Sequence, residues 1–133
     1  MDESFGKDEK LKSKKLIDIL FQEGKSVKKY PLKLIYLPIT NPEITNFKTG
    51  VSVPKKLVKT AVGRNRIKRL MREAFRKNKY LVINNFPKPY ALMFIYISRD
   101  EISLEELNKT MIKLMEKFNQ EENKQRWFFY KSA

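Results

Sequence analysis

The chain has 133 residues and a formal net charge of +14, from 29 Lys and Arg against 15 Asp and Glu. It contains no cysteine and no histidine, which excludes disulfides, thiolate zinc sites and an imidazole base. The length predicts a single domain over residues 1–133, with 1–9 and about 121–133 flexible or peripheral. Without a long apolar run or an apolar N-terminal segment, we expect a cytoplasmic protein that does not contact the membrane.

The first half of the chain predicts one helix followed by two strands. Apolar residues follow helical spacing and stop at Gly24, which predicts a helix over about 12–23. Branched and aromatic side chains alternate over 27–39 and again over 47–53, which predicts two strands. Because the turn-forming segment between these strands is short, we expect them to pair as an antiparallel hairpin.

The second half predicts two helices around one strand. Thr60 is a suitable N-cap for a helix that runs to about Asn78. The almost wholly apolar run at 90–97 predicts a central, buried strand, and Ser103 opens a capping box for the last helix. This element order predicts an α+β fold in which helices cover one face of a small mixed sheet.

The positive charge is concentrated in one part of the sequence. Thirteen Lys or Arg residues and one acid, Glu73, lie between Lys48 and Lys88, while the rest of the chain is nearly neutral. Such a concentrated field attracts polyanions to one face. Much of it is guanidinium, which pairs with phosphate through two hydrogen bonds and stacks on bases, so the composition favours nucleic acid.

The helix predicted after Thr60 has two different faces. At 100° per residue, its apolar side chains fall in one arc: Ile67, Leu70, Met71, Ala74 and Phe75. Polar and basic side chains fill the opposite side: Arg64, Asn65, Lys68, Arg69, Arg72 and Arg76. Solvated helix faces usually alternate charges of both signs, and this one has a single acid among its cations. We therefore expect a cationic ridge that binds a polyanion.

The sequence offers little for catalysis by the protein itself. Its acidic residues lie mostly in turns or on helix faces beside lysines, which is typical of solvated surface. There is no glycine-rich phosphate loop, and no carboxylate pattern suggests a two-metal site. We predict no catalytic residue and no metal ligand in the protein.

A composite motif resembles the bacterial ribonuclease P protein subunit family. The motif runs through Gly50-Val51-Ser52-Val53-Pro54-Lys55-Lys56, Ala61-Val62, Arg64-Asn65-Arg66-Ile67-Lys68-Arg69-Leu70 and Arg72-Glu73-Ala74-Phe75. The segment Leu20-Phe21-Gln22-Glu23-Gly24-Lys25-Ser26 is similar to that family as well. The predicted order of helices and strands agrees with that of the family from about Lys12 to Phe118. The resemblance implies a two-layer α/β sandwich with a mixed four-stranded sheet and a left-handed crossover through the basic helix.

The resemblance also implies a function within a ribonucleoprotein endoribonuclease. The family removes the 5′ leader of precursor tRNA, and its RNA subunit performs the hydrolysis with Mg²⁺. The protein would hold the ribonuclease P RNA and the leader, and Mg²⁺ would be held mainly by the RNA subunit and the substrate. No DNA partner is implied.

Site residues follow position by position from this resemblance. The RNA-binding set is Lys55, Lys56, Arg64, Asn65, Arg66, Lys68, Arg69 and Arg72. The set expected to line a cleft for the single-stranded leader is Ile17, Phe21, Lys33, Ile35, Tyr36 and Ser52. Aromatic side chains beside a cationic groove hold single strands with little sequence preference. Ile17 stands where the family often has an aromatic residue.

The side chains of the strand that contains Tyr36 can be assigned to the two faces of the sheet in two ways. A gapless match puts Lys33 and Ile35 on the cleft face and Tyr36 on the core face. A slip or bulge of one residue would reverse the two faces. The aromatic tail is open in a similar way, because Trp127 and Phe128 could pack in the core or add a contact.

Three other functions are weighed against this one. A ribosomal or ribosome-assembly protein would use the same basic helix without a single-strand cleft. A DNA-binding helix-turn-helix is less suitable, because the basic helix lies between strands and has no short partner helix before it. An autonomous nuclease is disfavoured because histidine is absent and carboxylates are not clustered.

Overall fold

A computed structural model describes the backbone of residues 6–132 and the side chains of this range except Lys7 and residues 125–132. The elements in chain order are η1 (Lys7–Glu9), α1 (Lys14–Glu23), β1 (Lys25–Lys29), β2 (Leu32–Pro38), β3 (Lys48–Ser52), α2 (Ala61–Asn78), α3 (Tyr80–Ile83), β4 (Tyr90–Tyr96) and α4 (Leu104–Ser132). The expectations for Trp127 and Phe128 concern side chains outside the described set. None of the described helices is long and apolar enough to cross a membrane.

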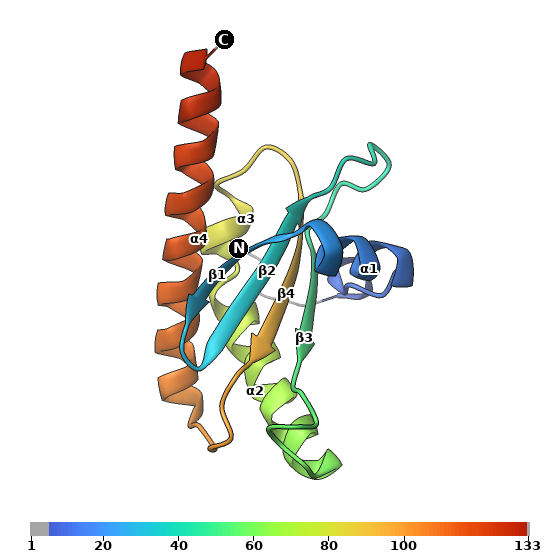
Figure 1. Cartoon of the computed structure of the whole chain (residues 1–133), viewed down its shortest axis with the longest axis vertical. Helices are drawn as coiled ribbons and strands as arrows, with labels where there is room; N and C mark the ends of the chain where they lie inside the picture. Colours follow the sequence, from blue (N-terminus) through green and yellow to red (C-terminus); the bar gives the residue numbers. More distant parts are fainter. Residues whose placement is uncertain (1–5, 133) are drawn as a thin grey trace.

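The four strands form one mixed sheet in the order β1-β2-β4-β3 (Figure 1). β1 and β2 are antiparallel, β2 and β4 are antiparallel, and β3 is parallel to β4. The predicted strand over 27–39 is therefore two strands joined by a turn at Tyr30-Pro31. The predicted hairpin with 47–53 is wrong, because β4 lies between β2 and β3.

Helices α2 and α4 cover one face of the sheet and bury the larger core. Leu34, Tyr36 and Phe94 of the strands pack there with Met71 of α2 and Phe118 of α4. A partly buried polar contact also joins the two helices, since Asn78 donates to the side-chain oxygen of Asn108 at 2.5 Å. The predicted core faces of both helices are confirmed, although Leu70 and Leu104 are only half buried. Burial of these apolar side chains is the dominant favourable contribution to the free energy of folding.

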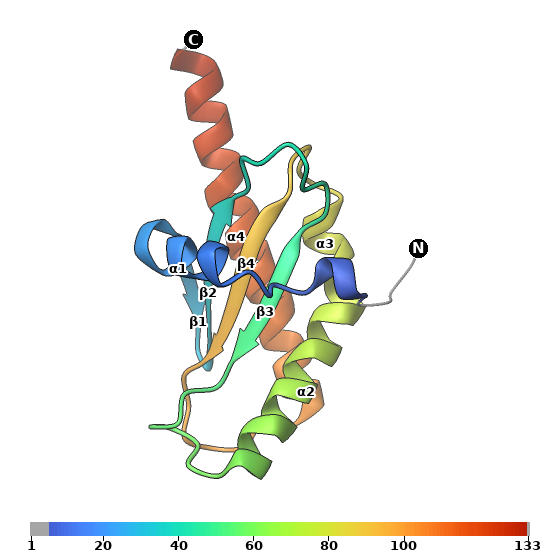
Figure 2. The same ribbon diagram turned by 90° about the vertical axis from the view of Figure 1, so that its right-hand side faces the viewer.

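The connection from β3 through α2 to β4 is left-handed. In Figure 2, β3 and β4 both point down, the helices lie behind the sheet, and β4 lies to the left of β3. Most crossovers between parallel strands are right-handed. The left-handed crossover carries α2 along the outer side of β3, so its N-terminus lies at the same end of the molecule as the end of β3 (Figure 2).

The N-terminal segment crosses the opposite face of the sheet. Glu9 accepts a hydrogen bond from the buried Lys79 at 2.8 Å, and the backbone N–H of Leu11 donates to the carbonyl of Thr49 at 2.9 Å. Leu11 and Leu20 of α1 then pack on Met93 in a second, smaller core. Residues 9–11 are thus fixed to the fold. Near the other end, Glu122 is buried and accepts from the Tyr90 hydroxyl at 2.8 Å.

We expect Gly24→Ala to destabilise the protein by about 1–3 kcal/mol, the usual range for overpacking. A Cβ at Gly24 would lie 2.3 Å from the carbonyl oxygen of Leu20 and 2.7 Å from Cγ2 of Ile35. Backbone at the end of α1 cannot move away without displacing the helix from β2. Urea denaturation followed by circular dichroism would measure the change. Gly6→Ala is the matched control, since nothing lies within 4 Å of that Cβ, and equal stability of both variants would contradict this packing.

Candidate nucleic-acid interface

Helix α2 begins where the sequence predicts. The Thr60 hydroxyl accepts a hydrogen bond from the backbone N–H of Gly63 at 3.1 Å, which satisfies one of the free donors of the first turn. The first turn contains no acidic residue, so the positive end of the helix dipole adds to the charge of nearby cations. This end of α2 therefore attracts anions.

The outer face of α2 carries cations that no described carboxylate neutralises. Arg69 and Arg72 are exposed and Lys68 is half exposed, and among the described residues none of the three has an ion-pair partner. Asn65 is exposed one turn before Arg69. Positions three and four residues apart lie on the same side of a helix, so Lys68, Arg69 and Arg72 form one cluster.

Other charged residues of α2 are paired, including Lys77, whose ammonium lies 4.0 Å from the Glu73 carboxylate. Arg66 donates to the Glu101 carboxylate at 3.1 Å, and both side chains are well exposed. The Arg76 guanidinium hydrogen-bonds Glu73 at 2.6 Å, and this bond, partly opposed by burial, lowers the pKa of the Glu73 carboxyl. Glu73 thus stays ionised and its charge is matched by Arg76. Glu73, the only acidic residue of α2, therefore neutralises little of the positive charge of Lys68, Arg69 and Arg72.

Arg64 has a structural contact that the sequence does not reveal. Its Nη1 donates to the carbonyl oxygens of Val58 and Lys59, each at 3.0 Å. These bonds hold the loop between β3 and α2 against the first turn of the helix. The same loop carries Lys55 and Lys56, which are both exposed. Arg64 therefore fixes the position of the two lysines relative to the cations of α2.

We expect Arg64→Lys to loosen this loop although the charge is unchanged. The planar guanidinium holds the two N–H groups of Nη1 in fixed directions toward both carbonyls, whereas a lysine ammonium rotates freely and is not held in this way. Amide hydrogen exchange over residues 55–60 should become roughly tenfold faster, as expected for the loss of about one hydrogen bond. RNA affinity should fall a few-fold. Arg69→Lys, the same change on the outer face of α2, should leave exchange in the loop unaltered, and similar exchange in both variants would refute the assignment.

The face of the sheet opposite α2 and α4 is partly open. Strand pairing aligns Lys28, Lys33, Ile95 and Ser52 in one row across this face. The next row contains Ser26, Ile35, Met93 and Gly50, and Leu11 of the N-terminal segment packs over its far end. We use the name open face for the row from Lys28 to Ser52 together with Ile35.

Helix α1 borders the open face with an apolar flank. Leu20 points at the sheet and is fully buried, whereas Phe21 is 51% exposed. Ile17 lies one turn before Phe21 on the same flank of the helix. Leu16 and Ile19 lie on the other flank and line a separate pocket with the end of β2. An exposed aromatic ring, lysines and a serine thus lie around one surface, a combination suited to an unpaired nucleic-acid strand.

Tyr36 does not belong to this surface, which corrects its predicted place in the cleft. It faces α4, is 2% exposed, and its ring lies 4.7 Å from that of Phe118. Burial, with smaller contributions from Glu122 and Glu121, raises the pKa of Tyr36 to about 12. The gapless alternative, with Lys33 and Ile35 on the cleft face, agrees with the observed strand register.

Two members of the open face were not predicted from the sequence. Lys28 lies opposite Lys33, and Ile95 lies between Lys33 and Ser52. β4 is apolar along its whole length, so no alternation marks which of its side chains face outward. Only the pairing of the strands, which the sequence does not provide, places Lys28 and Ile95 on the open face.

The described side chains do not form a metal site. In this part of the chain, no three acidic residues come together in a way that could hold a metal ion. The arrangement brings cations to a helix and a loop, and an aromatic ring to an adjacent face. Such an arrangement can bind a polyanion and guide a single strand.

Comparison with known proteins identifies relatives over most of the chain. A family model described as Ribonuclease P matches residues 5–119. The "Ribonuclease P protein component" of Porphyromonas gingivalis is 37% identical over 98 residues, which are 72% of this chain and 72% of that protein. The protein of the same name from Vibrio campbellii is 42% identical over 74 residues, or 56% of this chain and 59% of that protein.

Solved structures share the fold at lower identity. The RNase P protein from Thermotoga maritima is 22% identical with a TM-score of 0.67, covering 82% of this chain and 96% of that chain. The RNase P protein of Staphylococcus aureus is 24% identical with a TM-score of 0.66, covering 81% of this chain and 93% of that chain. The α+β architecture with its mixed sheet is therefore common to these proteins.

Proposed function

The chain belongs to the ribonuclease P protein family, and we propose that its cationic surface binds ribonuclease P RNA while its open face guides the precursor tRNA leader. As a family member it is the protein subunit of the ribonucleoprotein that processes tRNA 5′ ends, an endoribonuclease whose RNA subunit is catalytic. Family membership does not favour the ribosomal alternative.

The cluster of Lys68, Arg69 and Arg72 carries the proposal for RNA docking. These side chains project from a helix whose other face is fixed in the core, and no described acid pairs with them. Phosphates can therefore bind without first displacing a protein carboxylate. Lys55 and Lys56 extend the same surface, and Arg64 holds their loop in place. Asn65 and Arg66 lie at its edge.

The leader is assigned to the open face by its chemistry. Lys33 can pair with phosphate, Phe21 can stack on a base, and Ser52 can donate a hydrogen bond. Ile17 and Ile35 supply apolar contact between them. This surface makes few demands on base identity, as a protein that acts on many precursor tRNAs requires.

The remaining parts of the proposal concern metal, location and domain organisation. We propose that Mg²⁺ is held mainly by the RNA subunit and the substrate, since the described residues offer no carboxylate cluster for it. We further propose that the protein works in the cytoplasm. The chain would act as one RNA-binding domain.

The proposal is tested by cleavage of a precursor tRNA at low, near-physiological Mg²⁺. A bacterial ribonuclease P RNA is assayed with and without this protein, beside the protein alone. We expect leader removal only when both are present, because the RNA needs protein cations to offset phosphate repulsion at low Mg²⁺. Tight binding to ribosomal RNA without any stimulation of cleavage would overturn the proposal, and so would cleavage by the protein alone.

A further inference from the structure

A groove next to the open face lies between the edge strand β1 and helix α4. Its volume is about 430 Å³, within the range of roughly 300–1,000 Å³ common for small-molecule sites. The lining residues are Lys25, Ser26, Val27, Lys28, Tyr36, Lys117, Gln120 and Glu121. They come from β1, from Tyr36 of β2 and from α4, and the side chains from α4 are all exposed.

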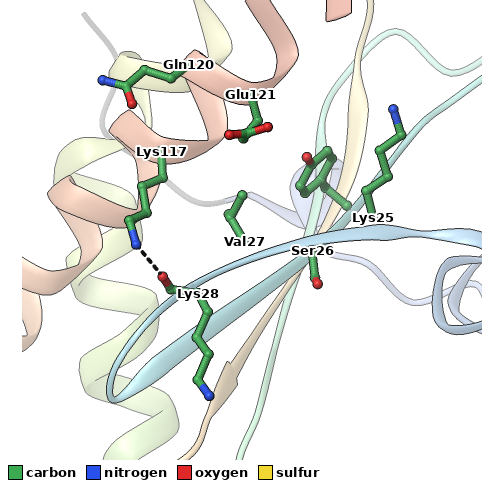
Figure 3. A pocket seen from close by; sticks show the side chains of 8 residues that line it. Lys25, Ser26, Val27, Lys28, Lys117, Gln120 and Glu121 are labelled. Carbon is green, nitrogen blue, oxygen red and sulfur yellow. Dashed lines mark hydrogen bonds between the residues drawn. The ribbon is translucent and has the colours of Figure 1, made fainter. Parts of the chain in front are cut away.

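The groove combines an apolar floor with charged walls. Val27 is half buried and forms the accessible part of the floor, while Tyr36, which also lines the groove, is nearly fully buried. Lys25 and Lys117 supply two ammonium groups from opposite walls, and Glu121 supplies a carboxylate (Figure 3). Lys117 donates to the carbonyl oxygen of Lys28 at 2.8 Å, which leaves two of its three N–H donors for another partner.

This composition matches a nucleotide better than a purely apolar or purely anionic ligand. A base can pack against the apolar side chain of Val27, while the ammonium groups of Lys25 and Lys117 pair with phosphate. The carboxylate of Glu121 accepts hydrogen bonds from the amino groups that adenine, cytosine and guanine carry and uracil lacks. The Tyr36 hydroxyl is neutral at physiological pH, and burial raises its pKa further, so the groove gains no negative charge from it.

β1 forms a wall shared by the groove and the open face. Figure 3 shows Val27 and Lys25 on the α4 side of the strand, and Ser26 and Lys28 on the other side. Lys28 belongs to the open face and pairs with Lys33, and Ser26 lies in the next row and pairs with Ile35. A strand of RNA that leaves the open face over β1 therefore passes basic side chains on both sides of this edge.

We propose that the groove between β1 and α4 binds a nucleotide of single-stranded RNA, as a second contact for leaders long enough to pass over β1. This inference rests on the proposed function and extends it by a site for the distal part of the leader. Short leaders end on the open face and do not reach the groove. Leader length therefore decides whether the groove contributes to affinity.

The test compares precursor tRNAs that differ only in leader length, bound to the reconstituted holoenzyme. In Lys25→Ala/Lys117→Ala, affinity for a long leader should fall roughly tenfold or more, as expected for two lost phosphate contacts. Affinity for a leader of a few nucleotides should change less than about twofold. Lys113→Ala/Lys124→Ala removes the same charge from exposed positions of α4 outside the groove. Equal effects of the two double variants on the long leader would overturn the proposal.

A second measurement does not depend on charge. The chain has no cysteine, so Gln120→Cys gives a unique attachment point for a thiol-specific photo-crosslinker at the groove. We expect crosslinks to long leaders and none to short ones, whereas Lys113→Cys should give none with either. Absence of crosslinks from position 120 to the long leader would refute the groove as a site. The proposed function fails separately, if the unaltered protein does not stimulate cleavage even with short leaders.

Discussion

Replacing Lys68, Arg69 and Arg72 together by alanine should weaken binding of ribonuclease P RNA about a hundredfold at 0.15 M salt. Each lost phosphate contact removes about 0.9 from the slope of log affinity against log salt for duplex, so the slope should become shallower by about 2–3. The three side chains lie on the outer face of α2 and none is fully buried. Filter binding over a range of salt concentrations measures both quantities.

The control for this triple variant removes the same charge elsewhere. Lys109, Lys113 and Lys124 are exposed on α4, outside α2 and its loop in the sequence. Their joint replacement by alanine should leave the slope almost unchanged, because they are not expected to contact phosphate. Circular dichroism and urea denaturation establish that both variants are folded. If both variants lost affinity equally, net charge rather than the α2 cluster would explain binding.

The helix that carries this cluster was predictable because its signals are local. Thr60 as N-cap, an apolar arc from Ile67 to Phe75 and a basic outer side all lie within 18 residues. The observed bounds, Ala61–Asn78, confirm the predicted helix. The contact of Arg64 with the loop was not predictable. From the sequence, a guanidinium on the basic side of the helix could equally bind phosphate or hold the loop. Only the positions of the carbonyl oxygens of Val58 and Lys59 distinguish the two roles.

The sheet was predicted less well because strand pairing is not local. Alternation over β2 and β3 identifies two strands but does not tell which strand lies between them. β1 gave a weak signal, since three of its five residues are lysines, which are common on edge strands. Reading β1 and β2 as one strand left the turn at Tyr30-Pro31 unrecognised. The face of Lys33 and Ile35 was nevertheless one of the two alternatives, since side-chain alternation depends only on the strand itself.

The largest effect expected on the open face is that of Phe21→Ala on substrates that carry a leader. Stacking of a base on an aromatic ring contributes about 1–3 kcal/mol, so affinity for precursor tRNA should fall about 5- to 150-fold. Affinity for mature tRNA, which has no leader to place on α1, should remain the same. The ring is half exposed and Leu20 holds the helix on the sheet, so the variant should fold. Binding of both RNAs to the reconstituted holoenzyme measures the difference.

Tyr80→Ala separates this role from a general loss of exposed aromatic surface. Tyr80 is 45% exposed, close to the exposure of Phe21, but it lies at the start of α3 and not beside the open face. Its replacement should leave the ratio of the two affinities unaltered. A Phe21→Ala variant that weakened precursor and mature tRNA equally would place Phe21 outside the leader path. The leader would then lie on the sheet alone, and Lys33 and Ser52 would have to supply its contacts.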